Sequence, residues 1–284
     1  MSKSAIHIIR TIESDVLTHR RAPKYVAKHM VLPDSIHRIA SEVFFRETRI
    51  RTIVWPENLE AIGARAFFHC TALKKVALPD SVCQIGSGAF SECTALDTIV
   101  LPSRLVSIES DLFGMDRHLK HVVFPDECRI SQIGSGAFFE CSALESISLP
   151  DSLHLIDRRA FYRCKELKHV DFPKGLKRIG DSAFYFCALE ELHLPDSLEV
   201  LGESAFFRCK QLVHVELPPS VKVIGKWCFH GCHSLKTLTI RHDPEFIGEW
   251  IINRAATIRC YRGSAADRYC QENELSVSYL DDEE

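Results

Sequence analysis

The chain lacks the features that mark several common classes of protein. It has no run of about 18 apolar residues that could cross a membrane, and its start, MSKSAIHIIR, has no apolar stretch of signal-peptide length. It also lacks an excess of one charge: the net charge is −3, and without the four acidic residues at the C-terminus the balance is +1. We therefore expect no membrane insertion and no binding to nucleic acid. As written the chain is expected to be cytoplasmic, or extracellular or at the cell surface if a leader has been removed.

Catalytic and metal-binding motifs are missing as well. The sequence contains no G-x-S-x-G, P-loop or H-E-x-x-H, and its 12 cysteines form no C-x-x-C pair of the kind that binds zinc. Stacked thiols could bind soft metals or form disulfides, but we interpret the main cysteine column as small buried side chains. Glu47 and Asp116 replace cysteine in two repeats. The column consists of Cys70, Cys93, Cys141, Cys164, Cys187, Cys209 and Cys232.

One repeat of about 23 residues dominates the sequence, typified by IGARAFFHCTALKKVAL at residues 62–78. Counted from proline to proline, it recurs nine times. A period of this length is typical of a solenoid, in which each unit buries its apolar face only by stacking on its neighbours. The units span residues 33–55, 56–78, 79–101, 102–124, 125–149, 150–172, 173–194, 195–217 and 218–240.

Each unit contains two recurring apolar features. A phenylalanine fills one position in all nine units, and stacking should align these rings in a ladder. A later L-x-x-V-x-L segment ends in period-two alternation, which predicts a short strand with the valine and the last leucine buried. The phenylalanines are Phe44, Phe67, Phe90, Phe113, Phe138, Phe161, Phe184, Phe206 and Phe229.

These positions predict an α/β repeat solenoid in the form of a leucine-rich-repeat horseshoe. A parallel β-sheet would line its concave face, and the segment from the repeat's glycine to its cysteine would form short helical turns on the convex face. The glycine after the isoleucine, as at Gly63 and Gly86, suits a backbone corner. The unit 125–149 has two extra residues and the unit 173–194 lacks one. We expect turns to absorb both changes without breaking the stack.

Three regions follow from this pattern: an N-terminal cap over residues 1–32, nine repeats over 33–240, and a C-terminal region over 241–284. The last region contains a degenerate repeat, a cap and an acidic tail that we expect to be disordered. Within it, residues 257–261 predict a strand, Ser264 predicts the start of a helix that ends near Asn273, and residues 275–280 predict a last strand. The N-terminal cap would use Ile6, Ile8, Ile9, Val16 and Leu17.

The recurring LPDSVxxIGxxAFxxCxxLxxVxLP resembles the BspA-type, or Treponema-type, leucine-rich-repeat family over residues 33–240. The ending RGSAADRYCQENELSVSYL is similar to the usual C-terminal cap of that family. The resemblance implies a bacterial repeat protein that binds other proteins, as the surface and host-interaction members of the family do. It is specific for the fold and loose for the function, since many members have no assigned role. The better-described members are exported, whereas this chain shows no signal peptide.

The residues on either side of the strand valine should point out of the concave face. The column after the valine is apolar over its first five strands and polar over its last five. An exposed apolar stripe on a solenoid is typical of a protein contact, although valine also fits any pleated strand surface. In chain order this column reads Val31, Val54, Ala77, Val100, Val123, Ser148, Asp171, His193, Glu216 and Thr239.

Together the two columns place three histidines and three acidic residues on three adjacent strands at residues 169–216. This cluster could bind a divalent metal, provide a base and an acid for hydrolysis, or form a pH-responsive contact surface. Cross-strand pairing on a wet sheet, or a protein contact, explains it better than a metal site or catalysis, because a flat sheet offers no pocket that excludes water. The column before the valine reads His29, Thr52, Lys75, Thr98, His121, Ser146, His169, Glu191, His214 and Thr237.

The observations favour a non-enzymatic module that binds another protein on its concave sheet, as a monomer or with weak self-association. Two alternatives remain open: a metal-binding or metal-dependent hydrolytic site at the His/acid cluster, and a passive surface or spacer element. We predict no catalytic residue, no metal ligand and no cofactor. The predicted partner-binding residues are Val54, Lys75, Ala77, Val100, His121, Val123, His169, Asp171, Glu191, His193, His214 and Glu216.

Overall fold

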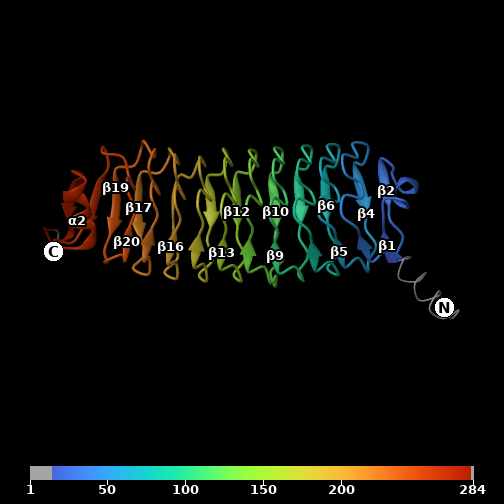
Figure 1. Ribbon diagram of the computed structural model, residues 1–284, viewed down its shortest axis with the longest axis horizontal. Helices are drawn as coiled ribbons and strands as arrows, with labels where there is room; N and C mark the ends of the chain where they lie inside the picture. The colour runs from blue at the N-terminus through green and yellow to red at the C-terminus, as the bar shows by residue number, and fades with distance from the viewer. Residues whose placement is uncertain (1–14, 283–284) are drawn as a thin grey trace.

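The chain forms a long solenoid whose rungs stack along one axis (Figure 1). The computed structural model describes residues 15–282. The described chain begins at one end of the stack and finishes at the other. Each rung has three sides, which are a strand of three or four residues, a strand of two residues and a segment of turns. The stack in Figure 1 runs straight, so the predicted horseshoe and its concave face are not confirmed.

The predicted L-x-x-V-x-L strands form the first side, which we call the strand face. They pair in parallel and in register, so that His29 lies opposite Thr52 and Val31 opposite Val54. The middle residue of each strand points toward the core and its neighbours point outward, as the alternation of a strand requires. The strands are β2 His29–Val31, β4 Thr52–Val54, β6 Lys75–Ala77, β8 Thr98–Val100, β10 His121–Val123, β12 Ser146–Ser148, β14 His169–Asp171, β17 His214–Leu217, β19 Thr237–Ile240, β21 Thr257–Cys260 and β22 Ser276–Tyr279.

Parallel strands of two residues form the next side, which we call the second sheet, and within the described chain their pairing lapses once, between residues 85 and 107. The isoleucine or leucine before the repeat's glycine ends each strand and points into the core, as Ile62 and Ile85 do. The sequence did not predict this sheet, because two residues are too few to show an alternation. Its strands are β1 Val16–Leu17, β3 Arg38–Ile39, β5 Ala61–Ile62, β7 Gln84–Ile85, β9 Ser107–Ile108, β11 Gln132–Ile133, β13 Leu155–Ile156, β15 Arg178–Ile179, β16 Val200–Leu201, β18 Val223–Ile224 and β20 Phe246–Ile247.

The third side, which we call the turn face, contains tight turns, and no helix occurs between residues 33 and 240. Most rungs have two residues of positive φ four positions apart, such as Arg65 at 53° and His69 at 58°. Left-handed residues interrupt a right-handed helix, so the predicted helical turns are not confirmed. The amides alternate instead: the N–H of Phe67 donates to Ala89 of the next rung, and that of Phe68 closes a turn onto Arg65.

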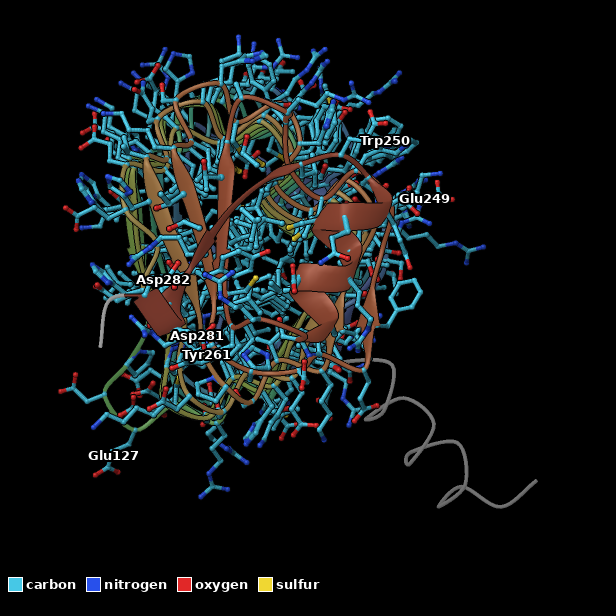
Figure 2. The ribbon with its side chains drawn as sticks, turned by 90° about the vertical axis from the view of Figure 1, so that its left-hand side faces the viewer. Glu127, Glu249, Trp250, Tyr261, Asp281 and Asp282 are labelled. Atoms are coloured by element: carbon cyan, nitrogen blue, oxygen red, sulfur yellow. The ribbon has the colours of Figure 1, made fainter. Side chains whose placement is uncertain are left out.

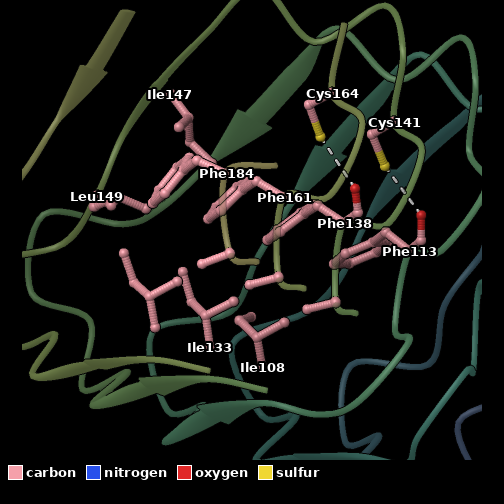
Figure 3. Packing of buried hydrophobic residues seen from close by; sticks show 14 of the residues in the cluster. Ile108, Phe113, Ile133, Phe138, Cys141, Ile147, Leu149, Phe161, Cys164 and Phe184 are labelled. Carbon is pink, nitrogen blue, oxygen red and sulfur yellow. Dashed lines mark hydrogen bonds between the residues drawn. The ribbon is translucent and has the colours of Figure 1, made fainter. Parts of the chain in front are cut away.

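The predicted phenylalanine ladder lies in the core between these three sides (Figure 3). Ring centroids of successive rungs are 5.0 to 6.1 Å apart. The cysteine column lies beside it, and each thiol donates to a phenylalanine carbonyl of the preceding rung, as Cys141 does to Phe113 and Cys164 to Phe138, both at 3.1 Å. All 12 cysteines are free, and burial raises the pKa of Cys70 to about 12. The column therefore consists of buried side chains, as interpreted, with one added hydrogen bond each.

The glycine after the isoleucine allows two rungs to touch backbone to backbone. A Cβ on Gly86 would lie 2.4 Å from the backbone nitrogen of Ala64, and one on Gly225 would lie 2.4 Å from the carbonyl carbon of Gly202. Neither Gly86 nor Gly225 has a positive φ. The glycines lie where the two-residue strand meets the turn segment, as predicted, and they are needed there for close packing between rungs and not for a positive φ.

The two repeats of unusual length interrupt pairing on the strand face, contrary to the expectation that turns would absorb the change. The ladder stops between β10 and β12, at the repeat with two extra residues, and again between β14 and β17. Residues 189–194 of the short repeat form no strand, so Glu191 and His193 lie in an irregular segment. A third lapse, between β4 and β6, falls between repeats of ordinary length. The second sheet continues unbroken from β9 to β20, and it keeps the stack continuous.

The N-terminal cap contributes its own rung. Strand β1 pairs with β3 and so extends the second sheet by one strand, and a 3-10 helix, η1 Ala22–Lys24, follows it. Leu17 is fully buried and Val16 is half-buried, in agreement with their predicted capping role. The other three predicted cap residues, Ile6, Ile8 and Ile9, lie outside the described residues.

The C-terminal cap closes the other end of the stack (Figure 2). Helix α2 Ala265–Glu272 begins as predicted after Ser264, whose side chain accepts a hydrogen bond from the N–H of Asp267 at 3.2 Å. A last 3-10 helix, η2 Leu280–Asp282, follows β22. The expected disorder of the tail is wrong for Asp281 and Asp282, because Asp281 accepts from the N–H of Arg262 and Asp282 binds its guanidinium at 2.7 Å.

Candidate protein-binding surface

A line of small apolar side chains runs along the N-terminal half of the strand face. Strand geometry turns these side chains away from the core, and parallel pairing in register aligns them. Three of the valines are strongly exposed, at 61% for Val31, 58% for Val54 and 45% for Val123. We call this line the apolar stripe, and it consists of Val31, Val54, Ala77, Val100 and Val123.

The C-terminal half of the strand face is polar, and two of its acidic residues, Asp171 and Glu216, bind neighbours other than the histidines. The hydroxyl of Ser148 donates to Asp171 across the β12–β14 pair at 2.6 Å. Arg241 donates to Glu216 at 2.9 Å. These contacts are the cross-strand pairs that a wet sheet favours, and both are exposed.

The three histidines of the predicted cluster also find separate partners. Nδ1 of His214 lies 2.8 Å from the hydroxyl of Thr237, and His193 lies 3.2 Å from Glu191 within its own segment. His169 lies 3.9 Å from Glu190, which the sequence did not single out. The cluster is dispersed because the segment that should connect its two outer strands does not form a strand.

The metal-binding alternative therefore gains no support from the geometry. Within residues 15–282, no three histidine, cysteine, aspartate or glutamate side chains converge on a point where they could hold a metal ion. Three convergent ligands are the usual minimum for a catalytic zinc site.

The remaining predicted positions lie as expected with one exception. Lys75 and His121 are exposed on the strand face, on either side of Thr98 in one row. Thr239, expected to be exposed, is only 4% exposed. Strand β21 of the cap lies directly beside it, with Arg259 in register.

Sequence reasoning missed a second aromatic column on the turn face. It consists of the residue directly after each core phenylalanine, and we call it the outer aromatic column. Its rings stack between rungs, with centroids 5.0 Å apart for Phe45 and Phe68 and 4.7 Å apart for Tyr162 and Tyr185. The signal was present as the Phe-Phe and Phe-Tyr pairs of the repeats, but a mixed column is harder to recognise than an invariant one. In chain order it reads Phe45, Phe68, Ser91, Gly114, Phe139, Tyr162, Tyr185, Phe207 and His230.

A family model described as the BspA type leucine rich repeat region matches residues 24–141 and 131–259, in six copies. These matches cover most of the chain. The chain belongs to the BspA-type leucine-rich-repeat family. No curated protein matches it.

Solved structures of leucine-rich-repeat proteins are also similar to this chain. The chain is similar to a leucine-rich repeat protein from Bacteroides ovatus, with a TM-score of 0.69 and 24% identity over 85% of this chain and 64% of that one. It also matches the leucine-rich repeat protein of T. pallidum at 33% identity, over 40% of this chain and 52% of that one, with a TM-score of 0.37. The chain thus spans about half to two thirds of these two proteins. The first match supports the fold.

One BspA-type repeat of this chain carries a buried acid in place of the column cysteine. Asp116 is 0% exposed, and neither carboxyl oxygen has a hydrogen-bond partner among the described residues. Burial raises the pKa of the Asp116 carboxyl well above its usual range, and it outweighs the opposing effect of the Cys93 backbone. The site therefore favours the neutral acid, whose O–H can donate a hydrogen bond as the cysteine thiols do.

Proposed function

We propose that this chain is a non-enzymatic protein-binding module whose strand face recognises a macromolecular partner. The single observation that carries the proposal is the apolar stripe. Val31, Val54 and Val123 are three of the seven large apolar side chains that are exposed among the described residues, and all three lie in one column of one face. Contiguous exposed apolar side chains on a rigid surface are typical of protein contacts. The polar half of the same column shows that the sheet does not require valine there.

The expected mode of recognition is rigid docking. The stripe supplies apolar contact, and the polar half of the strand face supplies hydrogen-bonding groups such as Asp171, His193 and Glu216 that select the partner. Because the rungs are stacked into one rigid core, and most neighbouring strands of this face pair in register, little conformational entropy is lost when a partner binds. In keeping with a role outside the bilayer, no helix within residues 15–282 is long and apolar enough to cross a membrane.

A pull-down from lysate with a triple variant of the stripe, Val54→Asp, Val100→Asp and Val123→Asp, tests the proposal. We expect the wild type to retain a specific protein and the variant to lose it. Burying three unpaired charges in an apolar contact costs more binding free energy than the loss of one contact at the rim, so the affinity should fall by more than about tenfold. Circular dichroism checks that the variant still folds, because Val54 and Val123 are exposed whereas Val100 is half-buried.

The matched control is Val106→Asp, since Val106 is 53% exposed and lies outside the apolar stripe, just before β9 of the second sheet. The control should retain the partner. Equal retention by the wild type and the triple variant would show that the partner does not bind through the stripe. If the wild type itself retains no protein, the passive spacer becomes the better interpretation.

A further inference from the structure

The outer aromatic column of the turn face has a gap two rungs wide. One stack ends at Phe68, and the next begins at Phe139, whose ring lies 5.2 Å from that of the following rung. The two rungs between them hold Ser91 and Gly114 at the same position. The column therefore lacks two consecutive rings near its N-terminal end.

A cavity of about 500 Å³ occupies the gap. Phe68 and Phe139 line it at either end, and Ser91 and Gly114 line it between them. Three rung spacings of about 4.8 Å separate the two end rungs by roughly 14 Å, which leaves room for two stacked rings. We call this cavity the aromatic slot.

The backbone beside the slot lacks the arginines that lie over the outer ring in the rungs on either side. At the first left-handed position of those rungs, Arg65 lies 5.7 Å from the centroid of Phe68 and Arg159 lies 5.7 Å from that of Tyr162. In the three rungs from the slot onward this position holds Gly88, Asp111 and Gly136. The two glycines place no side chain over the slot, and the Asp111 carboxylate lies against the backbone of Gly136.

The charge around the slot is mainly positive. Arg65, Arg158 and Arg159 line it, and Asp111 is the one carboxylate among its lining residues. Arg65 lies 3.8 Å from Glu42, whereas Arg158 and Arg159 form no ion pair with any residue of the described chain. Positive charge of this kind attracts an acidic partner. The attraction is stronger where an arginine binds a carboxylate through two parallel hydrogen bonds.

We propose that the aromatic slot binds an acidic segment of a partner protein that carries two aromatic side chains flanked by carboxylates. The two rings fill the gap in the outer aromatic column between Phe68 and Phe139, within the range of centroid separations at which aromatic pairs attract. The carboxylates pair with Arg158, Arg159 and Arg65. The slot lies on the turn face, so this interaction is independent of the strand face and goes beyond the function proposed above.

Calorimetric titration with short peptides tests the proposal directly. The probe is acetyl-Glu-Trp-Glu-Trp-Glu-amide, in which an extended backbone presents both rings on one side, about 6.8 Å apart. Acetyl-Glu-Leu-Glu-Leu-Glu-amide lacks the rings, and acetyl-Lys-Trp-Lys-Trp-Lys-amide reverses the charge. We expect one site per chain for the first peptide and at least about tenfold weaker binding for each of the other two. Equal binding of all three peptides would overturn the proposal.

Two sets of variants connect the binding to the slot. The double variant Ser91→Phe and Gly114→Phe restores the consensus of the column and should abolish binding by filling the cavity. Arg158→Glu should weaken binding about tenfold, and the matched control Arg178→Glu, an exposed arginine of β15 on the second sheet, should not. If the variant with two added phenylalanines does not fold, the comparison of Arg158→Glu with Arg178→Glu still tests the proposal, because both arginines are exposed.

Two further outcomes separate this site from its alternatives. The triple variant of the apolar stripe should bind the peptide like the wild type, so failure of the strand-face proposal leaves this one intact. A second copy of this chain could also occupy the slot, because Glu249 and the 45% exposed Trp250 offer an acidic and an aromatic side chain side by side at the rim of the C-terminal end (Figure 2). Sedimentation of the chain alone tests this alternative. Self-association that Trp250→Ala removes, without binding of the acidic peptide, would overturn the partner assignment.

Discussion

At the scale of the residue, the exceptions in each column of the repeat are more informative than the consensus. The cysteine column is uniform in its contacts, and each thiol donates to a carbonyl of the preceding rung. Asp116 occupies the same buried place with a group that ionises near pH 4 in an unfolded chain. A carboxyl in this environment stays neutral only because burial disfavours its charge. The stability of the fold should therefore depend on pH through this one side chain.

We predict that Asp116→Asn stabilises the protein increasingly as the pH rises. Below about pH 4 the carboxyl is neutral in both the folded and the unfolded chain, so its ionisation contributes nothing. Above that pH the unfolded chain releases the proton first, because the pKa of Asp116 is raised in the folded protein. The wild type then loses up to about 1.4 kcal/mol of stability per pH unit until the pH reaches the raised pKa.

Urea denaturation of both proteins between pH 4 and pH 8 measures this difference. The matched control is Asp126→Asn, which removes an exposed carboxyl in the next repeat and should leave the pH dependence unchanged. Asp116→Cys restores the column and should behave like Asp116→Asn. Parallel stability curves for the wild type and Asp116→Asn across this range would contradict the prediction.

At the scale of the element, the sequence predicts the strand face and the C-terminal helix well and the other two sides poorly. The long strands carry a clear alternation around residues such as Val76, and the helix has a recognisable N-cap at Ser264. The second sheet is invisible because its strands have two residues each. The turn face was mistaken for helical turns because positive φ at positions such as Arg65 has no signature in residue type.

The candidate site likewise has parts that the sequence predicts and parts that it does not. The apolar stripe could be predicted from the sequence, because alternation in register decides which side chains leave the core. The His/acid cluster could not, since it required a strand at residues 189–194 and the missing residue of that repeat prevents one. The aromatic slot depends on two small residues, Ser91 and Gly114, in a column that is recognised only when the rungs are stacked.

We predict that Ser264→Ala destabilises the C-terminal cap by about 1 kcal/mol, the usual cost of removing an N-cap side chain. The lost contact is the hydrogen bond from the N–H of Asp267 to the Ser264 hydroxyl. Hydrogen exchange of the amides in α2 should accelerate about fivefold, with little change in the central rungs. Ser264→Asp supplies another good capping side chain and should restore slow exchange. Uniform acceleration along the whole solenoid would contradict a local role of the cap.

At the scale of the whole molecule, the solenoid is a series of equivalent units, and each rung packs mainly on its two neighbours. Backbone hydrogen bonds connect successive rungs on all three sides, and the phenylalanine ladder runs through all nine repeats. The second sheet remains continuous across both repeats of unusual length. Such an arrangement tolerates a change in the number of rungs far better than a change within a rung.

Deletion of residues 150–172 removes one complete repeat and should give a folded protein. Leu149 then precedes Pro173, the same junction that Leu149 makes with Pro150, and Phe138 stacks on Phe184 in place of Phe161. We expect small-angle scattering to show a molecule about 5 Å shorter, since one strand spacing is lost. The melting temperature should fall by only a few degrees, because one set of contacts between neighbouring rungs is lost and the others remain.

Deletion of residues 150–160 is the matched control, because it removes half a rung and shifts every later column out of register. The core positions of the following rungs would then meet polar positions of the preceding ones, so this variant should unfold or aggregate. If each rung is stabilised mainly by its two neighbours, the deletion of 150–160 should cost far more stability than that of 150–172, although it removes about half as many residues. Equal loss of stability in both variants would mean that the solenoid is held together by interactions longer than one rung.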